Sequence, residues 1–354
     1  MISRTIFELV NSLVNIELDR PKYSLEIADA ELEPVKDLKP VALPKPSRTY
    51  STVVALDAST ATIHVGGGEL AISSGCIVLR NAFVYPSPKE VREGPPFIGA
   101  PLNTGCGWVT DRYVKLGVRY VDDPDLPEGA LAHDVRISLE TFLIGKVPDL
   151  AGVGNPYALV LIDGPVEYPI KHPKEGSSWN AEIARLNDDR VSAMRDLVHG
   201  GFIPVSIVKR VWGSRYLTRN SDIHYLTDVQ LVESVIELGE PLRRPSYVGP
   251  WIVKWEGTER VIYYIVNPLS RFTKMYSLFR VEFLRDSHEV AGRLVDDILS
   301  VIAYSAGSYG ITVPYKIYLA DYISKRTVSE LARFSQYVMM LKGLPTLYGG
   351  VTIE

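Results

Sequence analysis

The chain alternates between short apolar runs and longer segments in which apolar residues recur every three or four positions. The short runs are rich in β-branched residues, which predicts buried strands over 53–57, 157–166 and 202–210. The periodic segments predict helices over 5–18, 131–147, 180–199, 226–238, 289–307 and 327–341. In the last of these, Thr327 and Glu330 have the spacing of a capping box, which predicts a helix start.

Further strands are predicted beside these, several of them joined by tight turns. The stretch 69–86 is expected to pair with the first strand through a glycine turn, and residues 251–268 predict a hairpin. Residues 112–121 and 275–284 are additional strand candidates. Strands that alternate with helices, beside adjacent hairpin strands, predict an α/β fold with a mixed sheet.

The beginning of the chain differs from the rest. A helical pattern over 5–18 is followed by a proline-rich segment over 31–50, which predicts an extended arm. We therefore divide the chain into an N-terminal helix and arm, 1–48, and a main domain, 49–354. A helix on such an arm packs either on a partner subunit or on its own domain, and periodicity does not separate the two.

Composition narrows the class of protein. The chain has 354 residues, 46% hydrophobic and 23% charged, with a net charge of −4, so any nucleic-acid binding must depend on local basic patches. Cys76 and Cys106 have neither disulfide nor metal-site spacing, and no run of about 18 apolar residues predicts a membrane span. We expect a cytoplasmic protein. Few glutamines and many prolines are typical of a heat-adapted host.

Two of the predicted buried strands lead into an aspartate. Asp57 follows one and Asp163 the other, and neighbouring strands would bring the two carboxylates to one edge of the sheet. Glu140 borders the apolar stripe of helix 131–147 and could lean over the same edge. Carboxylates held together repel, and a divalent cation relieves that repulsion. Acids without Cys or His favour Mg²⁺ or Mn²⁺. The alternatives are an ordinary turn after Asp57 and a solvated Glu140.

The order of these parts resembles that of the RNase H-like fold. More narrowly, the chain resembles the NurA family of archaeal DNA-end-processing nucleases. The segments that carry the resemblance are VVALDAST (53–60), RISLE (136–140), LVLIDGPV (159–166), PVSIVKR (204–210), FRVEF (279–283) and VPYKIYLAD (313–321). Each motif is short, and their order and spacing over about residues 50–325 are what make the likeness specific.

The resemblance implies that Asp57, Glu140 and Asp163 are metal ligands. Asp321 stands where the family tends to have a histidine, and it could serve as a fourth acid and metal ligand, as in other RNase H-like nucleases. The terminal motif departs from the family, which tends to begin with Tyr-Pro and end with Ala-His. Here Val313 stands in place of the tyrosine, which puts substrate positioning in doubt, and Tyr315 is the nearest substitute.

The chemistry implied is phosphodiester hydrolysis with two Mn²⁺ or Mg²⁺ ions about 4 Å apart. Lys209 could counter the charge that develops on the phosphate, and its alternative is a solvated strand-end lysine. The run 208–219 interleaves cations with aromatic residues, which suits a DNA strand but is also compatible with an exposed hairpin. Its candidate DNA contacts, with Tyr315, are Arg210, Trp212, Arg215 and Tyr216.

The resemblance also implies 5′-to-3′ exonuclease action on single- and double-stranded DNA ends, with possible single-strand endonuclease activity. It further implies a homodimer that works with the hexameric helicase HerA in resecting double-strand breaks.

Two other functions stay open. LDAST and IDGP are similar to phosphate motifs of actin-like ATPases and sugar kinases, although no adenosine motif follows. A nuclease-like scaffold without activity, docked on a partner ATPase, is the non-enzymatic alternative. His64 is the one histidine close to Asp57, with a structural role as its default. Arg280 and Glu282 share a strand face and are interpreted first as a structural ion pair.

Overall fold

The computed structural model describes residues 31–32, 39–47, 50, 52–65, 68–87, 97–101, 129–152, 158–169, 178–218, 227–237, 243–255, 258–268, 276–306, 312–343 and 346–353. The predicted N-terminal helix 5–18, the strand 112–121 and Cys106 lie outside these residues. So does most of the glycine turn expected after the first strand.

The centre of the fold is a mixed sheet with the strand order β8-β7-β3-β4-β5. Its strands are β3 (Val53–Val65), β4 (Gly68–Val78), β5 (Ala82–Tyr85), β7 (Ala158–Asp163) and β8 (Phe202–Val208). β3, β4 and β5 are antiparallel neighbours, whereas β7 runs parallel to β3 and β8 parallel to β7. Three antiparallel strands followed by two parallel ones on the far side of the first form the RNase H-like arrangement. The predicted fold class is confirmed.

Antiparallel strands extend this core beyond β8. The next strands in order are β11 (Tyr276–Leu284), β10 (Thr258–Pro268) and β9 (Ser246–Trp255), so the predicted hairpin and late strand are confirmed. Short or peripheral strands pair at the margins: β1 (Glu31–Leu32) and β2 (Val41–Ala42) with β9, β6 (Phe97–Pro101) with β4, and β12 (Thr346–Ile353) with β3.

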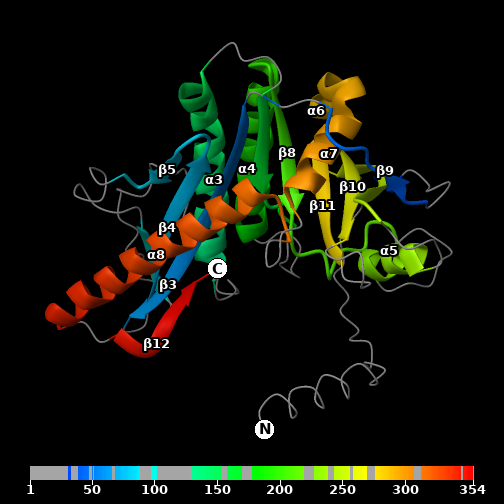
Figure 1. The fold of residues 1–354 in the computed structure, drawn as a ribbon. Helices are drawn as coiled ribbons and strands as arrows, with labels where there is room; N and C mark the ends of the chain where they lie inside the picture. Colours follow the sequence, from blue (N-terminus) through cyan, green and yellow to red (C-terminus); the bar gives the residue numbers. More distant parts are fainter. Residues whose placement is uncertain are drawn as a thin grey trace, which may run out of the picture.

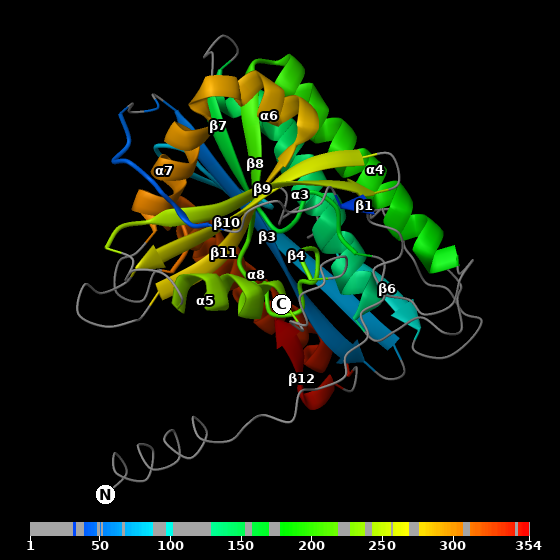
Figure 2. The ribbon, with the colours of Figure 1, turned by 90° about the vertical axis from the view of Figure 1, so that its right-hand side faces the viewer.

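Helices cover both faces of the sheet (Figures 1 and 2). The helices are α3 (Ala130–Ala151), α4 (Ser178–His199), α5 (Asp228–Glu237), α6 (Arg285–Ala291), the short 3₁₀ helix η2 (Gly292–Leu294), α7 (Val295–Ser305) and α8 (Tyr315–Leu341). α3 and α4 pack on one face of β3 and β7, and α7 and the start of α8 pack on the other. Figure 1 shows α8 crossing β3 and β4 along that second face. The helices predicted over 131–147, 180–199 and 226–238 are confirmed.

The two-residue alternation of a strand decides which helices each side chain meets. In β3, Val54 and Leu56 contribute to the core under α3 and α4, whereas Ala55 contributes to the core on the opposite face. Asp57 has the parity of Ala55 and therefore faces α8. Asp163 likewise shares the parity of Leu161, which belongs to the same second core.

Three boundary predictions are wrong. β3 does not end at Asp57 but continues to Val65, because it stays paired with β4 after β7 has ended. The helix predicted over 289–307 is broken between α6 and α7, where Gly292 has a positive φ of 47°.

The C-terminal helix begins at Tyr315, directly after Pro314, not at Thr327. Thr327 lies in the helix interior, where its hydroxyl donates to the carbonyl oxygen of Ile323. A capping-box pattern therefore occurs here within a continuous helix, because a threonine hydroxyl can also bond four residues back along a helix.

Candidate metal centre

Three carboxylates from distant parts of the sequence meet on the α8 face of the sheet. Oxygens of Asp57, Asp163 and Asp321 all lie within 4.8 Å of one another. Asp57 belongs to β3, Asp163 ends β7, and Asp321 lies in the second turn of α8. Among the described residues this is the group whose geometry suits a metal ion.

The parallel register of β3 and β7 brings the first two aspartates together. Leu56 is opposite Ile162, so the residues that follow, Asp57 and Asp163, are next to each other at the point where β7 ends. Their side chains share a face of the sheet, because the residues just before them, Leu56 and Ile162, both point to the opposite face, into the core with α3 and α4. The two aspartates thus meet as predicted, but they do so where β7 ends beside the middle of β3.

Small side chains let α8 approach closely enough to add the third carboxylate. Ala320 is fully buried against Cys76 and Val78 of β4. One turn further on, the hydroxyl of Ser324 donates to Asp57 Oδ2 at 2.6 Å and lies 2.8 Å from the hydroxyl of Ser59. Asp321 is thereby held over the strand that carries Asp57.

Lys209 supplies a positive charge within this group of acids. It directly follows β8, and its ammonium nitrogen lies 2.6 Å from Asp163 Oδ2 and 2.7 Å from Asp321 Oδ1. A second lysine, Lys325, lies 3.1 Å from the same oxygen of Asp321 and is more exposed. The lysine predicted at the end of this strand therefore contacts two of the three predicted aspartates.

The proximity of these charges shifts their protonation. Burial and the neighbouring Asp163 carboxylate raise the pKa of Asp57 well above its usual range. Burial opposes the charge on Lys209, but the surrounding carboxylates outweigh it and raise its pKa. Burial also opposes ionisation of Asp321, yet Lys209 and Lys325 together lower its pKa. Such opposed shifts in one cluster are typical of functional sites.

The donor set fits a hard divalent cation. Asp163 Oδ1 is buried and receives no hydrogen bond from a nitrogen or hydroxyl donor of the described residues, and the Asp57 carboxyl group lies beside the Asp163 carboxylate. The three nearest ligand atoms are all carboxylate oxygens, the ligands that Mg²⁺ and Mn²⁺ take. The three carboxylates could therefore hold a metal ion.

Glu140 is outside the three-carboxylate group. It lies on α3, which packs on the opposite face of the sheet from α8, and it is buried. Its Oε2 accepts hydrogen bonds from the Tyr168 hydroxyl at 2.8 Å and from Arg190 Nη1 at 2.7 Å. Burial raises the pKa of Glu140, and the Arg190 charge opposes that rise. In the described geometry this acid is bound to protein groups.

Buried charges also fix the loop that leaves β7. Arg190, which is fully buried, donates to the carbonyl oxygens of Asp163 at 3.3 Å and Pro165 at 3.2 Å. Glu282 accepts a hydrogen bond from the backbone nitrogen of Val166 at 2.9 Å, and Arg280 donates to Glu282 at 2.6 Å. The ion pair predicted between Arg280 and Glu282 is confirmed, and it supports the backbone beside the aspartate.

The predicted DNA-binding residues differ in exposure. Arg210 is exposed, Trp212 is 75% exposed and Arg215 is half-buried, all in the segment that follows Lys209. Tyr216 is buried, with the Arg280 guanidinium 4.6 Å from its ring centroid, so its ring faces protein and not solvent. Tyr315 is 52% exposed at the start of α8. The side chain of His64 lies outside what the structure describes.

Three residues that contact Asp57, Glu140 and the backbone of Asp163 were not singled out from the sequence. Ser324 follows Asp321 by three positions, one helical turn, which is the spacing that places it beside the same strand. Tyr168 follows Asp163 by five positions in a loop. Arg190 lies in an amphipathic helix, where an arginine normally predicts a solvated face. Of the three, only Ser324 had a usable signal.

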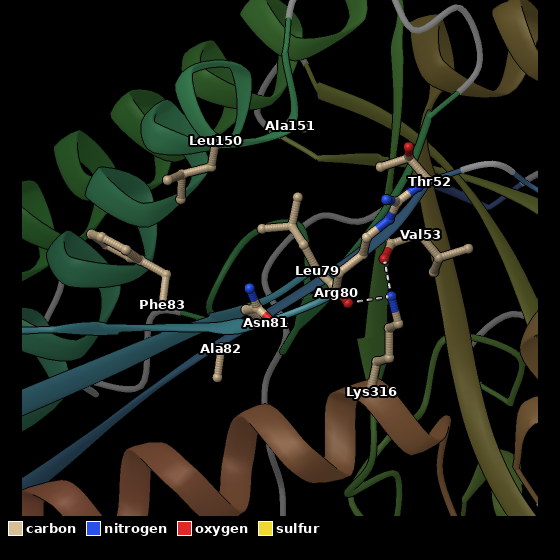
Figure 3. Close-up of a pocket in the computed structure, with 10 residues that line it drawn as sticks. All are labelled: Thr52, Val53, Leu79, Arg80, Asn81, Ala82, Phe83, Leu150, Ala151 and Lys316. Atoms are coloured by element: carbon tan, nitrogen blue, oxygen red, sulfur yellow. Dashed lines mark hydrogen bonds between the residues drawn. The ribbon is translucent and has the colours of Figure 1, made fainter.

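A cavity of about 580 Å³ opens at the start of β3, away from the carboxylates (Figure 3). It is bounded by the starts of β3 and β5, the end of α3 and the first turn of α8. Lys316 crosses its wall and donates hydrogen bonds to the carbonyl oxygens of Val53 and Leu79. No acidic side chain is among its described lining residues, so it does not share the chemistry of the aspartate site.

No protein family model and no curated protein sequence matches the chain. Solved structures that resemble it include the NurA nuclease from Sulfolobus solfataricus, at 12% identity over 95% of this chain and 94% of that one, with a TM-score of 0.43. NurA with manganese gives 12% identity, coverages of 96% and 97% and a TM-score of 0.44. NurA bound to dAMP and manganese gives 11% identity over 90% of this chain and 92% of that one, with a TM-score of 0.40.

These solved structures belong to the family that the sequence motifs resemble. At such identities and TM-scores the likeness concerns the general course of the chain, and the functional assignment depends on the side chains described above. Within the described helices, none combines the length and apolar character needed to cross a membrane.

Proposed function

We propose that the chain is a metal-dependent phosphodiesterase that cleaves DNA, a nuclease of the NurA type. The observation that carries the proposal is the convergence of Asp57, Asp163 and Asp321 within 4.8 Å, from two strands and a helix far apart in sequence. Like charges brought together where two of the three are buried are costly unless opposite charge compensates them, and a divalent cation is the compensation that all-oxygen ligands suit.

In this proposal the three aspartates hold the cation, and Asp163 offers the oxygen that lacks a donor. A bound divalent ion supplies activation of a water molecule and neutralisation of the leaving oxygen. Ser324 keeps the Asp57 carboxylate oriented through its 2.6 Å hydrogen bond. The residues of the chain thus fix the ligand oxygens before the ion arrives, which is the protein's share of metal catalysis.

Lys209 has two roles in the proposal. Without metal it neutralises Asp163 and Asp321, and when a cation takes over that task its ammonium group is free to contact a phosphate oxygen of the substrate. A fixed positive charge beside the scissile phosphate stabilises the charge that develops there. The exposed Arg210 and Trp212, which follow directly, offer a phosphate contact and a stacking surface for the adjoining nucleotides.

Glu140 enters the proposal through the family resemblance, which makes it a further metal ligand. To act so, its carboxylate has to exchange the hydrogen bonds it receives from Tyr168 and Arg190. Its present contacts support a second task, which is to anchor α3 and α4 beside the end of β7.

The polarity of cleavage, the oligomeric state and the partner are proposed from the resemblance of the sequence motifs to the NurA family. We propose 5′-to-3′ exonuclease action on DNA ends, with Mn²⁺ or Mg²⁺, by a cytoplasmic homodimer that works with a HerA-type helicase in double-strand break resection. The N-terminal residues 1–48 are the proposed dimer contact.

The test is cleavage of single-stranded DNA labelled at either end, in Mn²⁺, Mg²⁺ or EDTA. We expect metal-dependent cleavage by the wild type, its loss in Asp57→Asn and Asp163→Asn, and its retention in Asp188→Asn, which alters an exposed acid of α4. The order in which labelled products appear gives the polarity. Wild-type protein that cleaves nothing in Mn²⁺ at high temperature, with the helicase added, would contradict the proposal.

A further inference from the structure

The outward face of α8 carries aromatic and cationic side chains in an ordered row. Positions 315, 318, 322, 326 and 333 follow helical spacing, so they line one side of the helix. The residues are Tyr315, Tyr318, Tyr322, Arg326 and Arg333, here called the α8 stripe, and all five are exposed. Figure 1 shows this helix lying across the sheet, with its outer side away from β3 and β4.

Two tyrosines of the α8 stripe present their rings in the same orientation. The rings of Tyr318 and Tyr322 are 6.4 Å apart between centroids, with only 18° between their planes. The exposed fractions of these side chains are 39% and 49%. Aromatic side chains of this size are usually buried in a core, so neighbouring exposed rings with parallel planes indicate a surface on which flat groups stack.

Cations follow the tyrosines along the same side. Arg326 Nη1 lies 3.5 Å from the Tyr322 hydroxyl, and Arg333 lies 3.7 Å from Glu330, a loose contact between two exposed side chains. Such exposed pairs contribute little to stability. The guanidinium groups are therefore available to a partner that carries negative charge.

The α8 stripe is continuous with the aspartate site. Asp321 lies on the flank of the same helix, about 100° around its axis from Tyr322 and between the α8 stripe and the side that faces the sheet. Lys325, which contacts Asp321 at 3.1 Å, lies on the same flank and connects the site with the stripe. From Tyr315 to Arg333 the helix covers about 27 Å at its rise of ~1.5 Å per residue. That length equals about eight nucleotides at the ~3.4 Å spacing of a duplex strand, and fewer in an extended strand.

We propose that the α8 stripe is the track along which single-stranded DNA reaches the aspartate site. Its tyrosine rings stack on bases, and Arg326 and Arg333 contact phosphates. The inference deepens the proposed nuclease function, because it adds the surface that orients the strand whose phosphate Asp57, Asp163 and Asp321 would meet.

The chemistry of the α8 stripe favours a nucleic-acid strand over a second copy of this chain. Alternating rings and cations provide the stacking and phosphate contacts that single strands need, without selecting a sequence. Of the exposed apolar side chains near the end of the helix, Phe334, Val338 and Leu341 are rotated away from the stripe, whereas Tyr337 and Met340 lie on its side beyond Arg333.

The experiment measures binding of a fluorescein-labelled oligothymidine by anisotropy in EDTA, so that no strand is cut. Tyr318→Ala/Tyr322→Ala is expected to raise Kd about tenfold or more, because each stacked base contributes strongly. Arg326→Ala/Arg333→Ala is expected to weaken binding and to lower the slope of log K against log salt by about 1.4, two phosphate contacts at ~0.7 each. Phe334→Ala, an exposed aromatic of the same helix outside the α8 stripe, is the matched control and keeps wild-type affinity.

A second measurement separates the track from the catalytic site. Hydrolysis of bis(4-nitrophenyl) phosphate in Mn²⁺ uses a substrate too short to reach the α8 stripe, so the stripe variants are expected to keep wild-type rates on it. For DNA the same variants should raise KM more than they lower kcat. Light scattering on each variant reports oligomeric state, and melting temperatures report folding.

The outcomes separate the two proposals. Wild-type cleavage with unchanged DNA affinity in the stripe variants overturns the track and leaves the nuclease standing. Lost affinity in the variants, from a wild type that hydrolyses neither substrate, supports the track while the nuclease proposal fails. A change of oligomeric state in the stripe variants overturns the track, since the face is then an interface between copies.

Discussion

The ammonium nitrogen of Lys209 lies 2.6 Å from Asp163 Oδ2, on the face of the sheet where Asp57 and Asp321 also present their carboxylates. Lysine and aspartate come from adjacent parallel strands, β8 and β7, and each extends from the end of its strand. The lysine therefore carries the positive charge that a group of converging carboxylates requires. A metal ion held by these aspartates, as proposed, would satisfy the same oxygens as Lys209, so the effects of the ion and of the lysine on stability would be linked.

This relationship predicts how Lys209→Met changes stability. In EDTA the free energy of unfolding of the variant should be about 2 kcal/mol lower than that of the wild type. This loss is smaller than the roughly 3–5 kcal/mol expected when a fully buried pair is broken, because Lys209 is partly exposed. Mn²⁺ should stabilise the variant more than the wild type, because the ion no longer competes with an ammonium group. Thermal melts with and without Mn²⁺ provide the measurement.

Lys254→Met is the control for that comparison. Lys254 pairs with Glu259 at 3.4 Å, and both side chains are largely exposed, so its loss should change stability little and leave the Mn²⁺ effect as in the wild type. Equal Mn²⁺ stabilisation of wild type and Lys209→Met would contradict the idea that lysine and metal satisfy the same oxygens.

Ser324→Ala should weaken the site without unfolding it. Removing the hydroxyl leaves Asp57 Oδ2 buried without its 2.6 Å donor, and an unsatisfied buried acceptor costs about 1–3 kcal/mol. We expect lower unfolding free energy in urea and slower DNA cleavage, because the Asp57 carboxylate is free to turn. Ser329→Ala changes a serine of the same helix further along and should behave as wild type. Identical results for both variants would argue against a positioning role for Ser324.

Local pattern was enough to predict that Asp57 and Asp163 belong to buried strands, because each directly follows an apolar run rich in β-branched residues. The extension of β3 was not visible, since Ser59 and Thr60 resemble turn residues, and only pairing with β4 keeps them in the strand. Turn propensity was overridden by a tertiary hydrogen-bond ladder.

Contacts between the helices and the sheet could not be predicted from the sequence. Asp321 could be named only from a motif, because its approach to Asp57 depends on how α8 crosses β3. Arg190 shows the limit most clearly: an arginine in an amphipathic helix predicts solvent exposure, yet it is fully buried beside Glu140. Only the three-dimensional arrangement of α3, α4 and the loop after β7 explains why the charge of Arg190 is buried.

The pair of Glu140 and Arg190 predicts strong energetic coupling. Arg190→Met should cost about 3–5 kcal/mol, because it leaves a buried carboxylate without its 2.7 Å partner. Adding Glu140→Gln should restore part of that loss, since the uncompensated charge is then gone. Urea unfolding of the four proteins of this cycle gives the coupling energy. Arg195→Met, which breaks an exposed pair with Asp286 at 3.5 Å, is the control and should cost little.

The last prediction concerns pH and lies away from the carboxylates of the site. Asp134 is buried in α3, where Trp179 Nε1 donates to both of its oxygens, at 3.2 and 3.1 Å. Burial raises the pKa of Asp134 to about 8, and the hydrogen bond from Trp179 opposes that rise. The folded state therefore keeps a proton on Asp134 that the unfolded state, with a pKa near 3.8, releases.

A group that binds its proton more tightly in the folded state stabilises the fold fully below its unfolded pKa, and this stabilisation is lost as the pH rises to its folded pKa. Between pH 4 and pH 8 the unfolded chain holds fewer protons at this position, so the free energy of unfolding falls as pH rises, by at most about 1.4 kcal/mol per unit. Asp134→Asn keeps an acceptor for Trp179 but cannot ionise, so its stability should exceed that of the wild type by a margin that widens from pH 4 to pH 8. Asp149→Asn alters an exposed acid near the end of the same helix and should follow the wild-type curve. Urea denaturation at pH 4, 6 and 8 measures the margin, and parallel curves for Asp134→Asn and the wild type would show that Asp134 ionises in the folded protein as readily as in the unfolded chain.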